Sequence, residues 1–161
     1  MSAVTHFHPS GPLFRSEAGI ASPSGKCFTF SNYADGFLPS EGAVAIVIQK
    51  ASGAKSEPYA QIKASATMQD GRSLGFFSPN PNAQKALIEK ALNRADCGPD
   101  DISFLEAHGT GTQLGDAIEI SAINRVFGQA RTKPLIVGSA KAAIGHLEEA
   151  AGLIGENVLF C

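Results

Sequence analysis

The fold of this chain is decided by two stretches, Ile102-Ser-Phe-Leu-Glu-Ala-His-Gly-Thr-Gly-Thr112 and Pro134-Leu-Ile-Val-Gly-Ser-Ala-Lys-Ala-Ala-Ile-Gly-His146. Each begins with a short apolar run that predicts a buried strand. Each run leads into a glycine-rich loop that carries a histidine, His108 in the first and His146 in the second. Helical patterns follow both loops, so the strands are expected to be parallel, and ligands of such sheets gather beyond the carboxyl ends of the strands.

The rest of the chain supplies the other elements of a layered α/β domain. Residues 1–40 are interrupted by many Pro and Gly residues and are predicted to form loops and turns. From Tyr59 onward strand and helix patterns alternate, which indicates parallel strands joined by crossover helices. Strands are predicted at residues 43–48, 59–68, 102–105 and 134–137, and helices at residues 82–96, at 116–127 and from about residue 146.

Composition excludes several classes of protein. The 161 residues, of which 43% are hydrophobic and 17% charged, suit one globular domain and not a disordered chain. A formal net charge of −2 provides no basic excess for nucleic acid or anionic membranes. No apolar run approaches the about 18 residues that cross a bilayer, and no leader pattern is evident. We therefore expect a soluble, cytoplasmic protein.

Three side chains in the two loops are candidates for chemistry. His108 precedes four small residues that would let a substrate approach its ring, although it could equally cap the strand end by bonding to backbone. His146 is expected at a helix N-terminus, whose positive end would keep the ring neutral and able to donate an N–H to a developing oxyanion. Lys141 either points into the same site or is an ordinary solvated lysine.

Other polar residues have simpler explanations. Asp116 and Glu119 could be acid–base or metal carboxylates, but a capping box at the start of the helix explains their spacing better. Gly109 and Gly111 lack the third glycine of a nucleotide-binding fingerprint. No metal site is therefore expected.

None of the three cysteines has the surroundings of an activated nucleophile. Cys97 follows a predicted helix C-terminus, where negative potential disfavours the thiolate, and Cys27 precedes a bulky residue with no helix after it. Cys161 ends the sequence. Their odd number and their spacing also disfavour a disulfide scaffold and fit a reducing compartment.

Several motifs together resemble the β-ketoacyl synthase (ketosynthase) domain of polyketide synthases. They comprise residues 22–30, 34–43, 69–73, 106–112, 115–116, 138–148 and 150–152. The resemblance runs from about Phe14 to about Ile154 and implies an incomplete thiolase-like α/β fold. Residues 1–50 would be the tail of the N-terminal ketosynthase half, a loop-rich segment plus its last strand, and residues 51–161 a truncated C-terminal half.

The resemblance also implies a reaction, the decarboxylative Claisen condensation of polyketide and fatty acid biosynthesis. An acyl group is loaded onto a cysteine, and a malonyl group loses carbon dioxide to give the enolate that attacks the acyl thioester. By resemblance His108 and His146 stabilise the enolate oxyanion, and Lys141 supports their geometry and charge balance. Thr110 and Thr112 would bind substrate.

The partners implied by the resemblance are acyl carrier protein, acyl and malonyl thioesters and a second copy of the intact domain. No cofactor is expected in this segment, since the substrates are carried on the phosphopantetheine arm of acyl carrier protein. No nucleic-acid or membrane partner is expected.

The chain also departs from the family pattern. Gln113 stands where the family usually has Pro, Ser40 stands where it usually has Gly, and residues 156–161 drift from the pattern. The family's nucleophilic cysteine, in a Thr-Ala-Cys-Ser-Ser type motif, is expected upstream of Met1, so this chain alone is expected to be inactive in condensation. A non-catalytic relative that acts only through partner association remains an alternative, and the motifs disfavour a thiolase that uses acyl-CoA.

Overall fold

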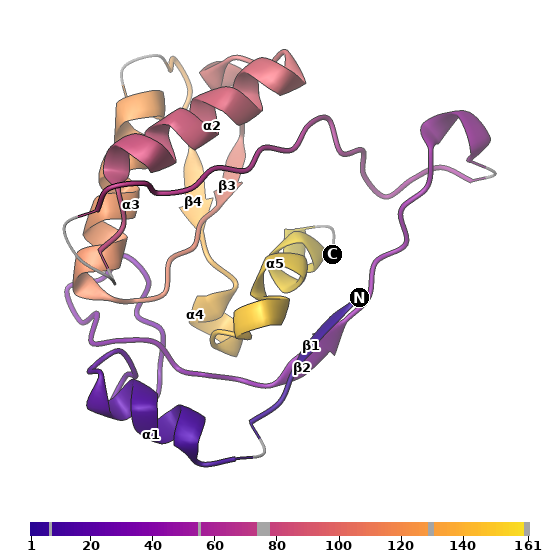
Figure 1. Ribbon diagram of the computed structural model, residues 1–161. Coiled ribbons are helices and arrows are strands. Elements are labelled where there is room, and N and C mark those ends of the chain that lie inside the picture. The colour runs from indigo at the N-terminus through magenta and orange to yellow at the C-terminus, as the bar shows by residue number, and fades with distance from the viewer. Residues whose placement is uncertain (7, 55, 74–77, 129–130, 160–161) are drawn as a thin grey trace.

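The computed structural model describes residues 1–6, 8–54, 56–73, 78–128 and 131–159. Two helices of 15 residues, α2 (Pro81–Ala95) and α3 (Gln113–Phe127), lie side by side at one end of the molecule, beside the short parallel strands β3 (Phe104–Glu106) and β4 (Ile136–Gly138) (Figure 1). The C-terminal helices α4 (Lys141–Ile144) and α5 (Ala151–Leu159) lie in the middle of this view, and the antiparallel strands β1 (Ser2–Val4) and β2 (Gly42–Val44) lie beyond them. The α/β class predicted from the sequence is confirmed.

The two long helices form where their patterns predict them. Helix α2 (Pro81–Ala95) begins after Asn80, whose side chain accepts the backbone N–H groups of the first turn, and it ends at Asp96 in a left-handed conformation. Helix α3 (Gln113–Phe127) begins three residues before the predicted start at Asp116. The predicted capping box is wrong, because Asp116 lies within the helix and its carboxylate bonds elsewhere.

The parallel strands position the two histidine loops. Strand β3 (Phe104–Glu106) pairs with β4 (Ile136–Gly138), with Phe104 opposite Ile136 and Glu106 opposite Gly138. Both strands are parallel neighbours as predicted, although each begins two residues later than its apolar run. The loops that follow them therefore leave the same edge of the pair.

One hydrophobic core holds these elements together. Helix α3 contributes Ile123, Val126 and Phe127, and the residue after β3 contributes Ala107. Side chains of α2, β3 and β4 pack against this cluster. A second cluster joins Val4 of β1 to the C-terminal segment, through residues Leu147, Ala150 and Ile154.

The N-terminal residues are more regular than predicted. Strand β1 (Ser2–Val4) pairs antiparallel with β2 (Gly42–Val44), and helix α1 covers Ser10–Glu17. The prediction of loops over residues 1–40 is therefore wrong in these two places. Pro12 lies in the first turn of α1, where a missing N–H costs nothing, because the first-turn N–H groups of a helix have no partner within it.

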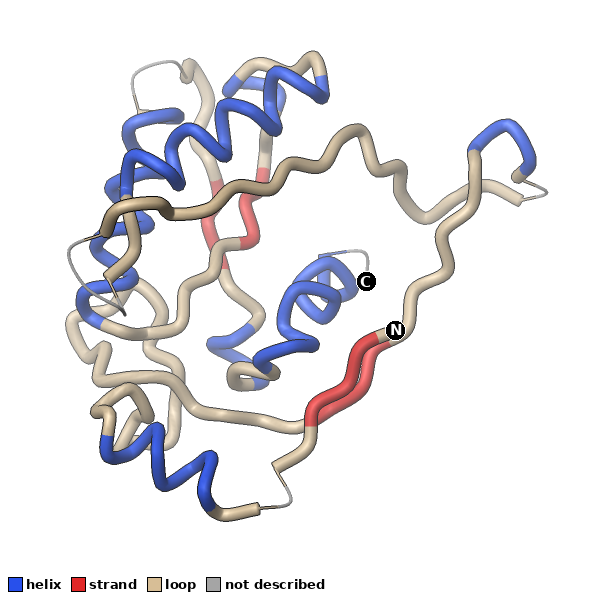
Figure 2. The backbone as a smooth tube through the Cα atoms, in the orientation of Figure 1, coloured by secondary structure: helices blue, strands red, loops and turns tan. Residues whose placement is uncertain are grey.

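Two predicted strands are shortened or absent. The run predicted as a strand at residues 43–48 pairs only as far as Val44, and residues 59–68 form no strand (Figure 2). Alternating side chains make a strand only when a neighbouring strand accepts the backbone hydrogen bonds. Here Lys90 and Arg94 of α2 donate to the carbonyls of Thr67 and Ser65 instead.

The predicted C-terminal helix is divided into three pieces. Helix α4 (Lys141–Ile144), the 3₁₀ turn Glu148–Ala150 and helix α5 (Ala151–Leu159) follow one another. Gly145 has φ +78° and lies against Leu38 and Ser40, which ends α4. The prediction of a continuous helix from His146 is therefore wrong, and His146 lies between two helical segments.

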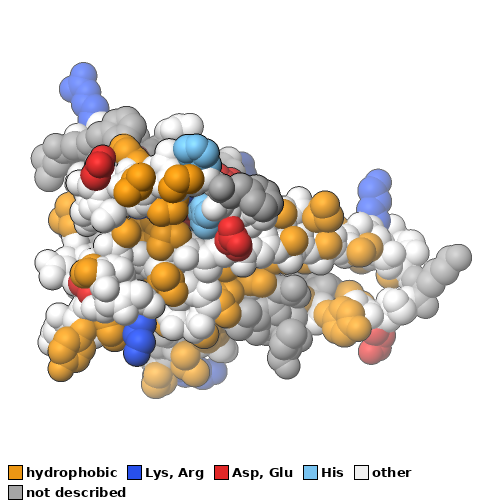
Figure 3. All heavy atoms as spheres, turned by 90° about the horizontal axis from the view of Figure 1, so that it is seen from below, with side chains coloured by type: hydrophobic (Ala, Val, Ile, Leu, Met, Phe, Trp, Pro, Cys, Tyr) orange, Lys and Arg blue, Asp and Glu red, His pale blue; other side chains and the backbone are white. Residues whose placement is uncertain are grey.

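Large hydrophobic side chains remain exposed along residues 45–62. The most exposed are Val47 at 95%, Ile48 at 68%, Tyr59 at 99% and Ile62 at 67%. This segment protrudes on the right of the space-filling view, with hydrophobic side chains along it (Figure 3). None of the helices in the described part of the chain has both the length and the apolar character to cross a bilayer.

Replacing Phe127, which is only 4% exposed in the core, should lower the free energy of unfolding substantially. We expect Phe127→Ala to lose about 3–5 kcal/mol, because both transfer free energy and packing are lost. Urea unfolding followed by circular dichroism measures the change. Ile120→Ala, on the same helix at 40% exposure, is the matched control and should lose much less. Equal losses would contradict the position assigned to this core.

Candidate functional site

The parallel strands bring His108 and His146 together. Their ring centroids are 5.4 Å apart, and the rings meet edge to face at 84°. Both rings line an open pocket of about 420 Å³, together with Lys141 and the carboxylate residues Glu106 and Glu148. The two histidines that follow the predicted parallel strands therefore line one cavity, while their catalytic roles stay a prediction.

The backbone around His146 is held by the loop before β2. The N–H of His146 donates to the carbonyl of Leu38 at 2.7 Å, and the N–H of Ser40 donates to the carbonyl of His146 at 3.0 Å. The ring packs edge-on against Phe37, with centroids 5.1 Å apart. These contacts fix the imidazole from residues far away in the sequence.

One hydrogen bond defines the tautomer of the His146 ring. The backbone N–H of Glu148 donates to Nδ1 of His146 at 3.0 Å. A backbone N–H can only donate, so Nδ1 accepts, and the neutral ring carries its proton on Nε2. His146 therefore has one N–H available as a donor.

The pKa of His146 lies far below its usual value, at about 4, mainly because burial disfavours the charged ring. The positive charges of His108, Lys141 and Arg15 lower the pKa further. The predicted neutral state is thus supported, but the predicted cause is not, because His146 does not lie at a helix N-terminus. A neutral imidazole can donate a hydrogen bond at physiological pH without carrying charge.

The His108 loop is held by a carboxylate from α3. Glu119 accepts the backbone N–H of His108 through Oε1 at 2.7 Å and that of Gly109 through Oε2 at 2.8 Å. The side chain of His108 stays accessible to solvent, yet surrounding protein atoms desolvate the ring, which lowers its pKa. The charge of Lys141 lowers the pKa of His108 further.

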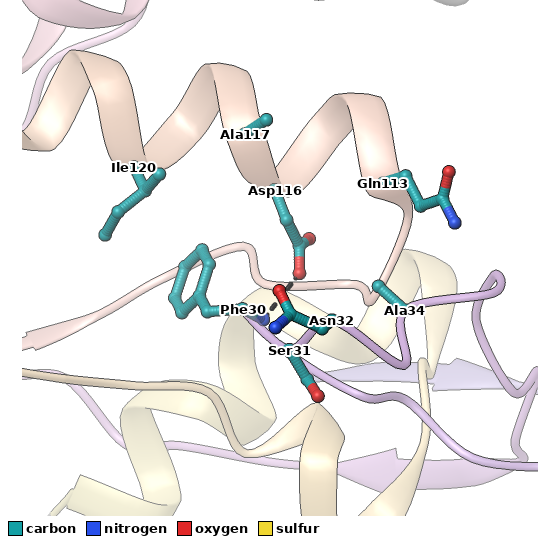
Figure 4. A pocket seen from close by; sticks show the side chains of 8 residues that line it. All are labelled: Phe30, Ser31, Asn32, Ala34, Gln113, Asp116, Ala117 and Ile120. Carbon is teal, nitrogen blue, oxygen red and sulfur yellow. Dashed lines mark hydrogen bonds between the residues drawn. The ribbon is translucent and has the colours of Figure 1, made fainter.

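A second carboxylate from α3 joins three segments. Asp116 is buried, and its Oδ2 accepts the N–H of Phe30 at 2.6 Å, while its Oδ1 accepts that of Gly111 at 3.1 Å. Figure 4 shows Asp116 pointing from α3 toward the loop that carries Phe30 and Asn32. The carboxylate thus connects that loop and the histidine loop to one helix.

Sequence reasoning missed the roles of Asp116 and Glu119. The available signal was their spacing of one helical turn, directly after the loop that carries His108, which places both carboxylates against that loop. A capping box explains the same spacing, so the sequence alone does not single out these contacts. Their contacts instead gather backbone N–H groups from the loop before the helix and from residue 30.

Glycine is required where the histidine loop approaches other backbone. Gly111 has φ +82°, and a Cβ there would lie 2.8 Å from the backbone nitrogen of Phe28. Gly109 has φ +46°, and a Cβ there would lie 2.8 Å from the Cβ of Ser139. Close packing of the loops therefore depends on these two residues.

Lys141 is buried, with only 6% of its surface exposed, and it lines the pocket with both histidines. The pKa of its ammonium is lowered by burial, while the charges of Glu106 and Glu119 oppose that shift. Of the two alternatives that the sequence leaves open for Lys141, its burial and position agree with the one in which it points into the same site. A buried cation beside two imidazoles disfavours protonation of both rings.

The predicted substrate-binding threonines occupy different surroundings. Thr110 is buried, and its hydroxyl lies 3.2 Å from that of Thr112, which precedes α3. Neither residue lines the pocket of the two histidines. Their role in substrate binding stays a prediction.

The described cysteines do not resemble activated thiols. Burial raises the pKa of the Cys27 thiol, although the N–H of Leu38 and the charge of Lys141 oppose the shift. Cys97 donates to the carbonyl of Ala95 at 3.4 Å, at the end of α2. Cys161 lies outside the described residues. A raised pKa keeps Cys27 in the thiol form, which is the less nucleophilic one.

Comparisons with protein families and known proteins agree with one another. Residues 59–159 match the family described as "Beta-ketoacyl synthase, C-terminal domain", and residues 3–54 match "Beta-ketoacyl synthase, N-terminal domain". Hispidin synthase of Neonothopanus nambi is 45% identical over 157 residues, which cover 94% of this chain and 9% of that protein. A phenolphthiocerol/phthiocerol polyketide synthase of Mycobacterium bovis is 43% identical over 144 residues, or 86% of this chain and 8% of that protein.

Solved structures show the same similarity. A ketosynthase domain of oxazolomycin biosynthesis from Streptomyces albus superposes with a TM-score of 0.93 at 36% identity, covering 98% of this chain and 28% of that chain. The ketosynthase from module 6 of the bacillaene synthase from Bacillus subtilis gives a TM-score of 0.94 at 35% identity, with 98% and 29% covered. The chain spans less than a third of these ketosynthase structures and less than a tenth of the two synthases.

The stability of the protein should depend on pH through His146. In the unfolded chain this ring takes up a proton near pH 6.5, but in the folded chain only near pH 4. The unfolded state therefore binds more protons between these values, so the free energy of unfolding should fall as pH decreases from about 6.5 to about 4.

Nuclear magnetic resonance titration of the His146 ring should give a midpoint near 4. His146→Gln, which cannot titrate, should lose this part of the pH dependence of stability while keeping the rest. A midpoint at or above the ordinary value near 6.5 would show that burial does not govern this ring.

Proposed function

Because this chain belongs to the β-ketoacyl synthase family, as part of a polyketide synthase ketosynthase domain, we propose that its pocket stabilises the enolate formed when a malonyl thioester loses carbon dioxide. The observation that carries the proposal is the contact of His108 with His146, whose Nδ1 is already occupied by a backbone donor. The Nε2–H of His146 is therefore available to an external acceptor. The substrate's thioester carbonyl oxygen is such an acceptor.

The chemistry follows from two neutral donors near one oxygen atom. When the bond between the malonyl α-carbon and its carboxylate breaks, carbon dioxide leaves and the electron pair moves into the enolate. Negative charge then develops on the thioester oxygen, where N–H groups of His108 and His146 stabilise it more strongly than they stabilise the substrate. In the condensation the enolate carbon attacks an acyl thioester and expels the thiolate that carried the acyl group.

Lys141 supports this site by its charge. Burial is the main cause that lowers the pKa of His108 and His146, and the ammonium of Lys141 lowers the pKa of both further, so both rings remain neutral donors at physiological pH. The same positive charge favours an anionic malonyl group and then the enolate. Lys141 thus acts on the protonation state of the histidines, which agrees with the role implied by the family resemblance.

The thiol that carries the acyl group is proposed to come from another part of the ketosynthase domain. Cys27 is buried and its pKa is raised, and Cys97 follows α2 and does not line the pocket of the two histidines. Acyl carrier protein as the donor of substrates, a dimer of the intact domain, substrate contacts of Thr110 and Thr112 and a cytoplasmic location all stay predictions. They rest on the family and not on a contact in this chain.

A second function, association with a partner without catalysis, is favoured by one observation. Large hydrophobic side chains along residues 45–62 are exposed, including Val47 and Tyr59. Several large hydrophobic side chains exposed along one short segment are unusual for a protein that acts alone. This alternative predicts binding without turnover.

Decarboxylation of malonyl-pantetheine by this chain, followed as release of labelled carbon dioxide, tests the proposal. We expect slow release that falls by about 10²–10³ in His146→Ala, because one oxyanion donor is lost. His8→Ala, at an exposed residue of the N-terminal segment, is the control and should not change the rate. Equal rates in the wild type and His146→Ala would refute the proposal, and no release at all would favour the non-catalytic alternative.

Acylation should fail in the same chain. After incubation with an acyl thioester, intact-mass measurement should show no stoichiometric adduct, because the thiol form of Cys27 is a poor nucleophile. A stoichiometric acyl group that passes from Cys27, Cys97 or Cys161 to a malonyl acceptor would show that the chain carries its own nucleophile.

A further inference from the structure

A strained residue lies beside the site. Glu148 has φ +44°, a left-handed conformation that is uncommon for residues other than glycine and that costs free energy. Its backbone N–H is the group that donates to Nδ1 of His146 at 3.0 Å. This N–H lies in the peptide plane between Leu147 and Glu148, so turning that plane changes ψ of Leu147 and φ of Glu148 together, and the strained φ accompanies the orientation that donates to the ring. A contact that holds Glu148 stabilises this arrangement.

That contact comes from helix α1, 133 residues earlier in the chain. Arg15 donates from Nε to Oε1 of Glu148 at 2.6 Å and from its terminal nitrogen to Oε2, so both carboxylate oxygens are held. The two side chains are largely buried, at 15% and 20% exposure. A bidentate arginine–carboxylate pair that is shielded from water is stronger and more directional than a surface ion pair.

We propose that Arg15 and Glu148 are positioning residues, whose ion pair holds Glu148 in its left-handed conformation and thereby keeps the proton of neutral His146 on Nε2. The inference rests on the proposed function, since an Nε2–H is useful there only if an oxyanion develops in the pocket. Neither residue needs to touch the substrate. The pair acts through the backbone N–H between them and the imidazole.

The mechanism follows from the two tautomers of the ring. With Glu148 left-handed, a proton on Nδ1 would face the backbone N–H, so that tautomer is disfavoured. If Glu148 relaxes to negative φ through a flip of the Leu147–Glu148 peptide, in which ψ of Leu147 changes in the opposite sense, its N–H turns away from the ring and Nδ1 becomes free to carry the proton. A part of the molecules would then present an unprotonated Nε2 to the pocket, which repels an oxyanion.

Arg15 has a second, purely electrostatic effect that a test must separate. Its positive charge is one of the causes that lower the pKa of His146. His6 also faces the pair, with Nε2 4.0 Å from Oε2 of Glu148. Loss of charge alone would change the pKa of His146 but leave the tautomer of the neutral ring unchanged. The tautomer is therefore the informative readout.

Two substitutions at Glu148 separate the effect of backbone strain on the tautomer from the effect of losing the carboxylate charge. Both Glu148→Gly and Glu148→Ala remove the carboxylate, but only glycine adopts φ +44° without a steric cost. We expect Glu148→Ala to lower the ratio of Nε2–H to Nδ1–H by about fivefold, the equivalent of one ordinary hydrogen bond. Glu148→Gly should retain most of the wild-type ratio.

The measurement is the ¹⁵N chemical shift of both His146 ring nitrogens at pH 7 in the full chain. Arg15→Met should lower the ratio as Glu148→Ala does, and Arg15→Lys, which keeps the charge but has only one donor nitrogen, should restore part of it. Arg125→Met is the matched control and should leave the ratio unchanged, because Arg125 bonds to Asn82 on α2. The resonances of α2 and α3 report that each variant is folded.

An unchanged tautomer ratio in folded Glu148→Ala or in folded Arg15→Met would overturn the inference. Equal ratios in Glu148→Ala and Glu148→Gly would overturn it as well, since the strained conformation would then be irrelevant. The readout needs no turnover. A chain with the expected tautomer pattern and no decarboxylation would therefore refute the proposed function and leave the positioning role in place.

Discussion

Parallel pairing of β3 with β4 is the constraint on which the site depends. Because Glu106 lies opposite Gly138 in that pairing, the loops that follow both strands leave the same edge, and two histidines 38 positions apart in the chain come into ring contact. The hydroxyl of Ser139 donates to the carbonyl of His108 at 3.3 Å and connects the two loops directly.

Two carboxylates of α3, of which Asp116 is buried and Glu119 half-buried, convert this pairing into a defined site. Asp116 and Glu119 accept four backbone N–H groups between them, from Phe30, His108, Gly109 and Gly111. Such charge-assisted bonds are stronger than neutral ones, and they fix loops that glycine would otherwise leave free. Burial lowers the pKa of both imidazoles, and at His108 the charges of Glu119 and Asp116 oppose that shift, so rigidity and neutral donors have separate origins.

Outside the core beneath α3, part of the molecule exposes large hydrophobic side chains to solvent. The core beneath α3 is packed, whereas residues 45–62 expose Val47, Ile48 and Tyr59 without any strand beside them in the described part of the chain. In the relatives this chain represents less than a third of a ketosynthase structure. The stability of the isolated chain is therefore expected to depend on a further protein surface that covers the exposed hydrophobic side chains of residues 45–62.

Local patterns in the amino-acid sequence were enough to predict most of the elements and the loops of the site. The helical periods behind α2 and α3, the two parallel strands and the small-residue loops around His108, His146 and Lys141 each depend on neighbours within a few positions. The motifs in these loops were also specific enough to indicate the family. Features that depend on contacts between residues far apart in the sequence, in contrast, became known only from the tertiary structure.

Residues 59–68 have the pattern of a strand, but no neighbouring strand in the described part of the chain accepts their hydrogen bonds. The cause of neutrality at His146 is burial and nearby charge, which no local pattern reports. The ion pair of Arg15 with Glu148 joins residues 133 positions apart, and a separation of that length is set by how the chain packs and not by any local periodicity.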